Sequence, residues 1–225
     1  MASAATSSYD TDGLNLQHYL WKDVVGYNIH PDIPVKDNKD FAIADVGTGT
    51  GIWLIDVNRQ LPSARLDGFD VSADQYPPKE WLPANVSLKT LDVHKPVPEE
   101  LKGKYDIVHV RLFLTVVKND NPLPILENLM EMLSQWPPRL GDSFTQQGFK
   151  NVSHNPYPSS PEVRGFFTQV QCMVAEEFSF IALDNSGPQK SGPAHRRRIQ
   201  AAAQEAKEGA AIHFILEVTV GRKPA

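Results

Sequence analysis

The stretch Asp45-Val-Gly-Thr-Gly-Thr-Gly-Ile-Trp53 decides the fold of this chain. The apolar run Phe41–Val46 leads into it and predicts a short, buried parallel strand. Residues 52–60 follow with the apolar spacing of a helix. Glycines between a strand and a helix permit positive φ angles and a close approach of a ligand to the backbone. The free N–H groups of the helix N-terminus then face the turn.

The same alternation of strand and helix continues beyond this unit. Further strands are predicted at 66–71, 86–91 and 105–110, a helix at 125–133, late strands at 149–153 and 212–220, and late helices near 162–180 and 196–207. The alternating pattern of 86–91 is typical of an edge strand. A short helix is expected within 14–30, ended by Pro31 and Pro34. This order predicts an α/β fold with a mostly parallel sheet, whose ligands bind beyond the carboxyl ends of the strands.

Composition narrows the classes of protein that remain. The chain has 225 residues, 41% of them hydrophobic and 22% charged, which predicts one globular domain. The net charge of −5 disfavours binding to nucleic acid. One cysteine, Cys172, excludes an intramolecular disulfide and a Cys-x-x-Cys zinc site, so no metal and a reducing, cytoplasmic compartment are expected. No apolar run reaches the length of a membrane span.

Three nucleotide ligands compete for the glycine turn. A dinucleotide fingerprint requires a third glycine where Ile52 or Leu54 stands, and a P-loop requires a Gly-Lys-Ser/Thr ending that is missing. An acid two residues before the first glycine is instead the pattern of S-adenosylmethionine binding. Asp45 suits the cationic end of that ligand, whereas a bare carboxylate would repel a pyrophosphate.

Two further acids follow predicted strands. Asp70 ends the second strand, where a carboxylate accepts both hydroxyls of a ribose. Asp92 follows the third strand and suits the adenine amino group, while Val93 offers a backbone N–H and apolar cover. Aspartates at strand ends are also common as turn formers and helix caps. The prediction of S-adenosylmethionine binding therefore depends on the glycine turn, Asp45, Asp70 and Asp92 occurring together in this order.

With these residues in place, the chain resembles class I S-adenosylmethionine-dependent methyltransferases. More narrowly, it resembles the fungal secondary-metabolism group that includes the velvet-complex regulatory methyltransferase. The stretches that carry the resemblance are Leu14–His18, Gly26–Pro31, Asp45–Trp53, Gly68–Ser72, Asn85–Val86, Leu91–Val93, Tyr105–Arg111 and Val220–Pro224.

The resemblance implies a Rossmann-like sheet of seven strands with helices on both faces, and transfer of a methyl group from S-adenosylmethionine. It places the amino-acid end of the cofactor at Asp45 and the turn glycines, the ribose at Asp70 and the adenine at Asp92. The turn glycines are Gly47, Gly49 and Gly51. His109 and Arg111 lie two apart on the fourth strand, so they share a face and would lie beside the methyl donor as the catalytic candidates.

The chain departs from that family after the helix that ends near Leu133. Between Leu133 and Gly148 there is too little sequence for the usual strand, helix and connections, which need roughly 25 residues. The central fifth strand is therefore expected to be shortened or missing, and the last strand is then free to pair with the fourth.

The sequence and the resemblance together predict an S-adenosylmethionine-dependent methyltransferase that acts on a small-molecule acceptor, a secondary metabolite. Two alternatives stay open: a non-catalytic, methyltransferase-like regulatory or binding protein, and a cofactor-bound cyclase or pericyclase. Residues 1–35 are expected to form an N-terminal extension or cofactor lid and residues 36–225 the methyltransferase-like domain. The run His195–Arg198 is either a nuclear address or a solvated helix face.

Overall fold

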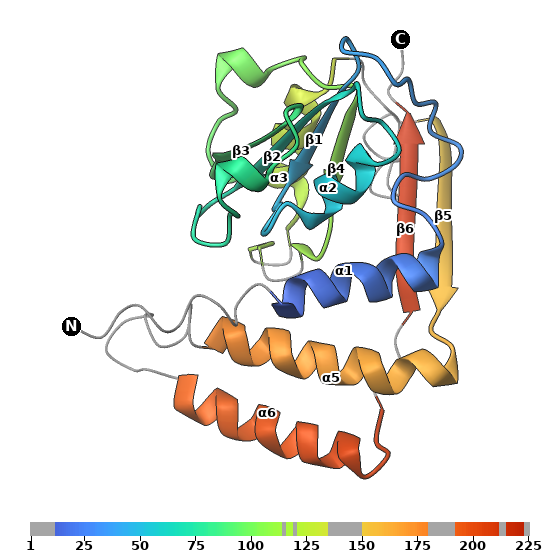
Figure 1. Ribbon diagram of the computed structural model, residues 1–225, viewed down its shortest axis with the longest axis vertical. Coiled ribbons are helices and arrows are strands. Elements are labelled where there is room, and N and C mark those ends of the chain that lie inside the picture. The colour runs from blue at the N-terminus through green and yellow to red at the C-terminus, as the bar shows by residue number, and fades with distance from the viewer. Residues whose placement is uncertain are drawn as a thin grey trace, which may run out of the picture. The chain divides into compact units, whose positions relative to one another are not determined.

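The computed structural model describes residues 12–113, 116–118, 121–134, 150–179, 192–211 and 215–222. Helices and strands alternate along the chain, as the sequence predicts (Figure 1). In order, they are α1 (Asp12–Val25), β1 (Ala42–Val46), α2 (Ile52–Asn58), β2 (Arg65–Asp70), η1 (Lys79–Trp81), β3 (Val86–Thr90), η2 (Glu99–Leu101), β4 (Ile107–Val110), α3 (Leu123–Met132), β5 (Lys150–Pro158), α5 (Pro161–Phe178), α6 (Gly192–Lys207) and β6 (Ile215–Arg222).

The first four strands form one parallel sheet in the order β3-β2-β1-β4. This arrangement confirms the α/β class and places β3 at an edge. β1 lies in the middle, and in its register Asp45 is opposite His109 of β4 and Gly68 of β2. The carboxyl ends of the four strands therefore meet at one edge of the sheet, where the sequence predicts the ligand site.

Two apolar cores cover the two faces of this sheet. Strand residues alternate between the faces, so Ile43 packs with Trp53 and Leu54 of α2, whereas Ala44 packs with Leu129 of α3. α2 and α3 accordingly lie on opposite sides of the strands (Figure 1). Helices on both faces are what a doubly wound fold requires, since every strand of a parallel sheet is buried on two sides.

Near the place where the fifth strand is expected, the described residues contain one isolated bridge. Leu133, just after α3, forms an isolated parallel bridge with Tyr105, and Ser134 N–H donates to the Tyr105 carbonyl at 2.7 Å. β6 pairs with β5 in a separate two-stranded sheet, so the alternative in which the last strand joins the fourth is wrong. Residues 135–149, where the rest of the shortened segment falls, lie outside the described residues.

The first helix ends earlier than the prolines predict. α1 stops at Val25 because Gly26 takes a φ of +88° and its N–H donates to the Lys22 carbonyl at 2.7 Å. A glycine in the left-handed region is a common helix terminator. Pro31 and Pro34 therefore lie beyond a stop signal that already exists.

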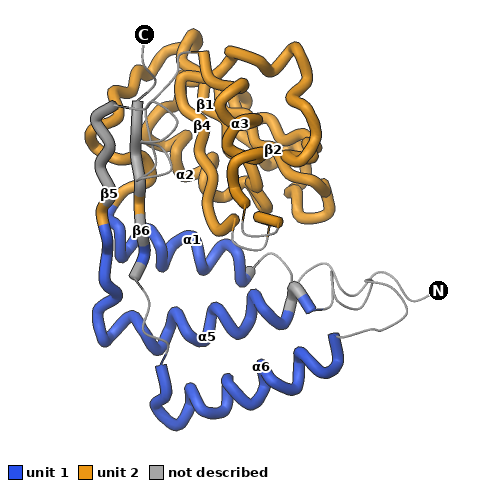
Figure 2. The backbone as a smooth tube through the Cα atoms, turned by 180° about the vertical axis from the view of Figure 1, so that it is seen from behind, with its two compact units in different colours: residues 1–26, 156–217 blue, residues 27–155, 218–225 orange. Residues whose placement is uncertain are grey.

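Two compact units make up the chain: residues 1–26 with 156–217, and residues 27–155 with 218–225 (Figure 2). The sheet β3-β2-β1-β4 belongs to the second unit. In the first unit, α5 contacts both α1 and α6. The expected boundary after residue 35 stays a prediction. None of the described helices combines the length and the apolar composition needed to cross a membrane.

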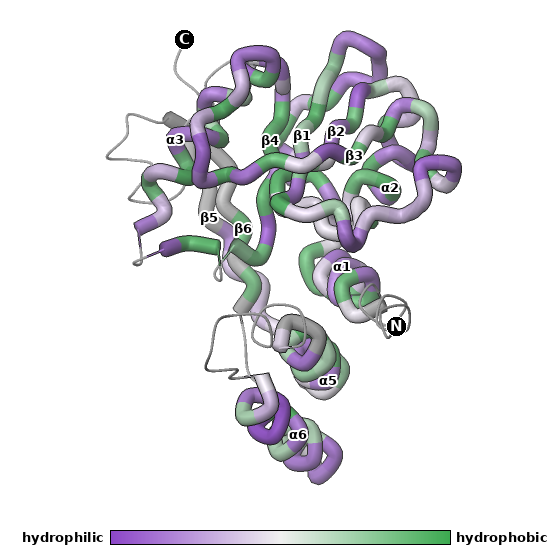
Figure 3. Tube along the Cα trace, turned by 90° about the vertical axis from the view of Figure 1, so that its left-hand side faces the viewer, coloured by the Kyte–Doolittle hydropathy of each residue, from purple (hydrophilic) through white to green (hydrophobic). Residues whose placement is uncertain are grey.

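The basic run 195–198 lies in α6, whose backbone is coloured mostly hydrophilic in Figure 3. Arg197 and Arg198 are exposed, and Arg196 donates to the Ser179 hydroxyl at 3.2 Å. This placement is that of a solvated helix face, the simpler of the two interpretations. The nuclear address stays a prediction.

Candidate cofactor and acceptor site

The glycine turn follows β1 and leads into α2. Gly47, Gly49 and Gly51 have φ angles of +75°, +55° and +76°. The N–H groups of Gly47 and Thr48 both donate to the Phe69 carbonyl, at 2.7 and 3.0 Å, so the turn is fastened to β2. Side chains are disfavoured at such φ values, which explains why glycine stands at each position.

Neighbouring side chains also leave little room for a Cβ atom at two positions of this turn. A Cβ atom on Gly47 would overlap the Phe113 ring, and one on Gly51 would lie 3.2 Å from the Leu88 methyl groups. The sequence suggested positive φ angles and close approach of a ligand at these positions. Packing against neighbouring side chains is an additional reason for the motif.

Asp70 is the last residue of β2, and its carboxylate is held at the glycine turn. Oδ2 accepts the Gly49 N–H at 2.9 Å and Oδ1 accepts the Val71 N–H at 2.7 Å. Each carboxylate oxygen carries a further lone pair, so the group retains acceptor capacity for a diol. The structure thus joins two of the predicted site elements through one hydrogen bond.

The loop after β3 brings Asp92 and Val93 to the same sheet edge. Asp92 Oδ1 accepts the His94 N–H at 3.0 Å, and Lys95 Nζ lies 3.6 Å from Oδ2. The backbone hydrogen bond, followed by the lysine charge, holds the pKa of Asp92 below its usual value. The Val93 carbonyl accepts from the Asn128 amide at 2.8 Å, which fixes the loop to α3.

Asp45 makes a contact that the sequence did not predict. Its Oδ1 lies 2.7 Å from Nδ1 of His109, directly across the β1–β4 register. Asp45 is 3% exposed, so its charge is almost fully withdrawn from water. The His109 ring stacks on the indole of Trp53 with centroids 3.8 Å apart and planes within 2°. The Trp53 indole N–H in turn points at the Asn28 carbonyl, 3.3 Å away.

Arg111 lies beside the same acid, one residue past the end of β4. Burial lowers the pKa of Arg111, and the negative charge of Asp45 opposes that shift. The next residue, Leu112, has a φ of +59°, a conformation that is uncommon for a branched side chain. Asp45 thus lies near both His109 and Arg111. The spacing of the last two suggested that they share a face, but not that Asp45 joins them.

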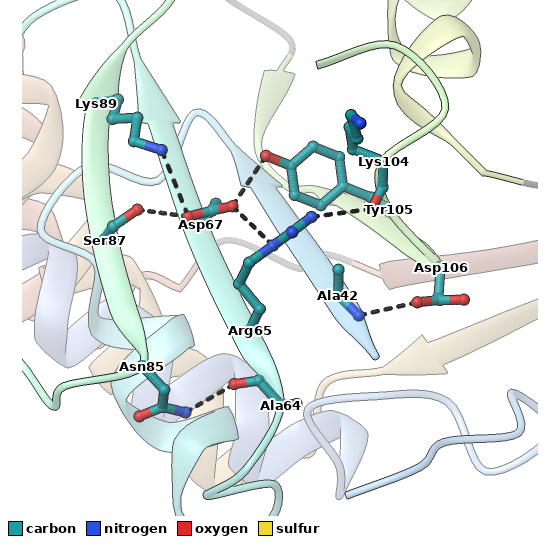
Figure 4. Close-up of polar contacts among 10 residues, drawn as sticks. All are labelled: Ala42, Ala64, Arg65, Asp67, Asn85, Ser87, Lys89, Lys104, Tyr105 and Asp106. Atoms are coloured by element: carbon teal, nitrogen blue, oxygen red, sulfur yellow. Dashed lines mark hydrogen bonds and ion pairs between the residues drawn. The ribbon is translucent and has the colours of Figure 1, made fainter. Parts of the chain in front are cut away.

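A second cluster of polar side chains surrounds Asp67 on the opposite face of the sheet (Figure 4). Its carboxylate accepts from the Tyr105 hydroxyl at 3.0 Å and from the Ser87 hydroxyl. Arg65 Nε and Lys89 Nζ lie 3.4 and 3.7 Å from its oxygens. Burial and the charge of Asp67 raise the pKa of Tyr105. Both oxygens of the buried Asp67 carboxylate have partners, which indicates a structural role.

A metal site finds no support in the described part of the chain. No three His, Cys, Asp or Glu side chains gather there in the way that a metal ion would need. Cys172 lies on α5, where burial raises the pKa of its thiol. A thiol in that environment stays protonated and is a poor nucleophile.

Comparison of sequences finds fungal methyltransferases. Methyltransferase grgD of a Penicillium species is 35% identical over 142 residues, which cover 57% of this chain and 47% of that protein. N-methyltransferase tcpN of Claviceps purpurea is 31% identical over 120 residues, 53% of this chain and 43% of that one. The secondary metabolism regulator LAE1 of Hypocrea atroviridis is 30% identical over 89 residues, 39% and 25% of the two chains. No protein-family model matches.

Comparison of structures finds methyltransferases with a similar fold. Phosphoethanolamine N-methyltransferase 2 of Haemonchus contortus superposes with a TM-score of 0.52 at 13% identity, over 99% of this chain and 61% of that one. Coclaurine N-methyltransferase superposes with a TM-score of 0.51 at 14% identity, over 99% and 73%. The fold is that of a class I methyltransferase. The expected resemblance is confirmed, and the chain spans about half the length of grgD and less of tcpN.

Proposed function

We propose that this chain is an S-adenosylmethionine-dependent methyltransferase that acts on a small-molecule acceptor. One observation carries the proposal: the Asp70 carboxylate, at the end of β2, is hydrogen-bonded to the glycine turn that leaves β1. A ribose-binding acid and a turn that admits a ligand therefore form one unit. The methyltransferase names of the relatives and the cofactor product bound in the two solved structures support the same ligand.

The residues at this sheet edge suit the parts of that cofactor. Asp70 would accept the ribose hydroxyls, since both of its oxygens are held by backbone donors and each keeps a lone pair. Asp92 would accept from the adenine amino group, with Val93 beside it. The glycine turn, Gly47 to Gly51, would face the amino-acid end. Asp45 is buried against His109, so it would act on that cationic end through its charge.

The acceptor would lie beside His109 and Arg111. S-adenosylmethionine, when bound, supplies an electrophilic methyl group. The protein contributes position, because holding a nucleophile in line removes much of the entropic barrier. An amine or hydroxyl of a secondary metabolite is the proposed acceptor, in keeping with the N-methyltransferase name of tcpN. The proposed compartment is the cytoplasm.

Isothermal titration with S-adenosylmethionine and with its demethylated product tests the proposal. Asp70→Ala removes hydrogen bonds to a charged acceptor, each worth about 1.5–3 kcal/mol, so the affinity should fall at least roughly tenfold. Asp40→Ala is the matched control, since Asp40 is exposed and precedes the amino end of β1. Absence of heat with the unsubstituted chain for either ligand would refute cofactor binding.

One observation favours a second function, that of a non-catalytic regulatory protein. The sequence between Leu133 and Gly148 is too short for the usual fifth strand and its connections, and the described residues there show one bridge, between Tyr105 and Leu133. LAE1, one of the relatives, carries the name of a regulator. Binding of the cofactor without release of its demethylated product, across a panel of amine and hydroxyl acceptors, would favour this alternative.

A further inference from the structure

The contact between Asp45 and His109 determines which ring nitrogen of the histidine carries a proton. An ionised carboxylate only accepts hydrogen bonds, so at 2.7 Å the Nδ1 atom must be the donor. In a neutral imidazole the other nitrogen, Nε2, then has a bare lone pair. Within the described part of the chain, Nε2 has no hydrogen-bonding partner, and 23% of the His109 side chain is exposed.

Trp53 fixes the plane of the ring. The indole is 3% exposed and stacks on the imidazole at 3.8 Å with nearly parallel planes. Its own orientation is set by the hydrogen bond from Nε1 to the Asn28 carbonyl. His109 is therefore restrained in two ways, by a hydrogen bond along the ring edge and by an aromatic surface across its face. A merely space-filling histidine needs neither a buried acid nor a chosen tautomer.

The charges near His109 favour this arrangement. Asp45 is the acid that contacts it, and Arg111 lies close enough to Asp45 to feel its charge. A buried carboxylate without partners would be costly, and these two groups provide Asp45 with a hydrogen-bond donor and a nearby positive charge. Because the Asp45 carboxylate accepts the hydrogen bond, Nδ1 of His109 carries the proton. The lone pair of Nε2 is then free to accept a proton.

We propose that Asp45 is a positioning residue, and that it holds His109 with Nε2 as the base that removes a proton from the acceptor. The inference rests on the proposed function. It specifies the substrate class as an acceptor whose attacking nitrogen or oxygen carries a proton that must leave. The N–H or O–H bond breaks, its electron pair stays on the acceptor, and the proton moves to Nε2. From the resulting imidazolium the proton passes to water at the exposed part of the ring.

Nitrogen-15 NMR of the histidine rings tests the tautomer without cofactor or substrate. His109→Gln identifies the His109 signals by their loss. The unsubstituted chain should show a protonated Nδ1 and a bare Nε2 at a pH where the ring is neutral. In Asp45→Asn the amide donates to Nδ1, so the proton should move to Nε2. Asp40→Asn, at an exposed acid, should leave the spectrum unchanged.

Activity provides the second measurement. His109→Gln should lower kcat about 10²–10⁴-fold, the usual contribution of a general base, while cofactor affinity by titration is retained. A protonated Nε2 in the unsubstituted chain would overturn the inference, and so would an unchanged kcat in His109→Gln. The wild-type spectrum needs no variant, so misfolding of Asp45→Asn would not remove the test. If the unsubstituted chain does not bind the cofactor in the titration, the proposed function itself is refuted.

Discussion

Replacing Gly47 with alanine separates two reasons for the glycine in the turn after β1. The first is conformational, because φ is +75° at this position. The second is steric, because a Cβ atom would overlap the ring of Phe113 and lie 3.1 Å from its Cζ atom. Gly103 provides a matched control: its φ is +63°, and a Cβ atom there would meet nothing within 4 Å.

The two substitutions should therefore differ in the free energy of unfolding. A left-handed φ costs a residue with a Cβ atom about 1–2 kcal/mol. Alanine recovers about 0.4–1 kcal/mol through the smaller entropy of the unfolded chain. Gly103→Ala should thus destabilise the protein by about 1 kcal/mol. Gly47→Ala adds an overpacking cost of about 1–3 kcal/mol, because the aromatic ring has to move. The expected total for Gly47→Ala is about 2–4 kcal/mol.

Urea denaturation of four variants measures these quantities. They are Gly103→Ala, Gly47→Ala, Phe113→Ala and the double variant of the last two sites. The double variant should show a favourable coupling, since the smaller side chain removes the overlap and leaves only the conformational cost. Equal destabilisation by Gly103→Ala and Gly47→Ala, or no coupling with Phe113→Ala, would refute the steric argument. The motif would then be explained by the turn conformation and the ligand alone.

Two further predictions concern buried and half-buried tyrosines. Tyr105→Phe removes the hydroxyl that donates to Asp67 at 3.0 Å, but leaves Ser87 and Arg65 as partners of the carboxylate. The free energy of unfolding, measured in urea, should therefore fall by about 1–2 kcal/mol. An unchanged free energy of unfolding would contradict a stabilising role for the cluster in Figure 4. Burial, and then the charge of Asp70, raise the pKa of Tyr76 from 10.0 to about 12, while its hydroxyl donates to the Lys89 carbonyl at 2.7 Å. The unfolded chain therefore releases this proton first, so the stabilisation is complete below pH 10.0 and is lost as the pH rises through about 12. Between these pH values, the free energy of unfolding measured in urea should fall less for Tyr76→Phe than for the unsubstituted chain. An equal fall in both proteins would contradict the raised pKa of Tyr76.

Local signals in the sequence predict the strands, the glycine turn and the acids at the strand ends. Asp70 was placed correctly at the end of β2 because apolar runs and glycines mark strand ends within a few residues. The pairing of Asp45 with His109 was missed, because these residues are 64 apart in the chain and meet only through the register of β1 with β4. The stacking of Trp53 depends on the same register and on the way α2 crosses the sheet. No local pattern encodes either contact.

Asp67 and Asp45 are both buried in the same sheet, but their positions along the strands suit them to different roles. Asp67 lies in the middle of β2 and faces the α3 side, where hydroxyl and cationic donors from three segments of chain surround it. Asp45 lies near the carboxyl end of β1 and faces the α2 side, where its partner His109 is partly exposed. The Asp67 carboxylate is buried, and both of its oxygens are already engaged by these partners. A proton taken by His109 reaches solvent or an acceptor, since a ring at the strand end borders the ligand edge of the fold. The same residue type thus stabilises the sheet at one position and, in the proposed mechanism, orients a base at the other.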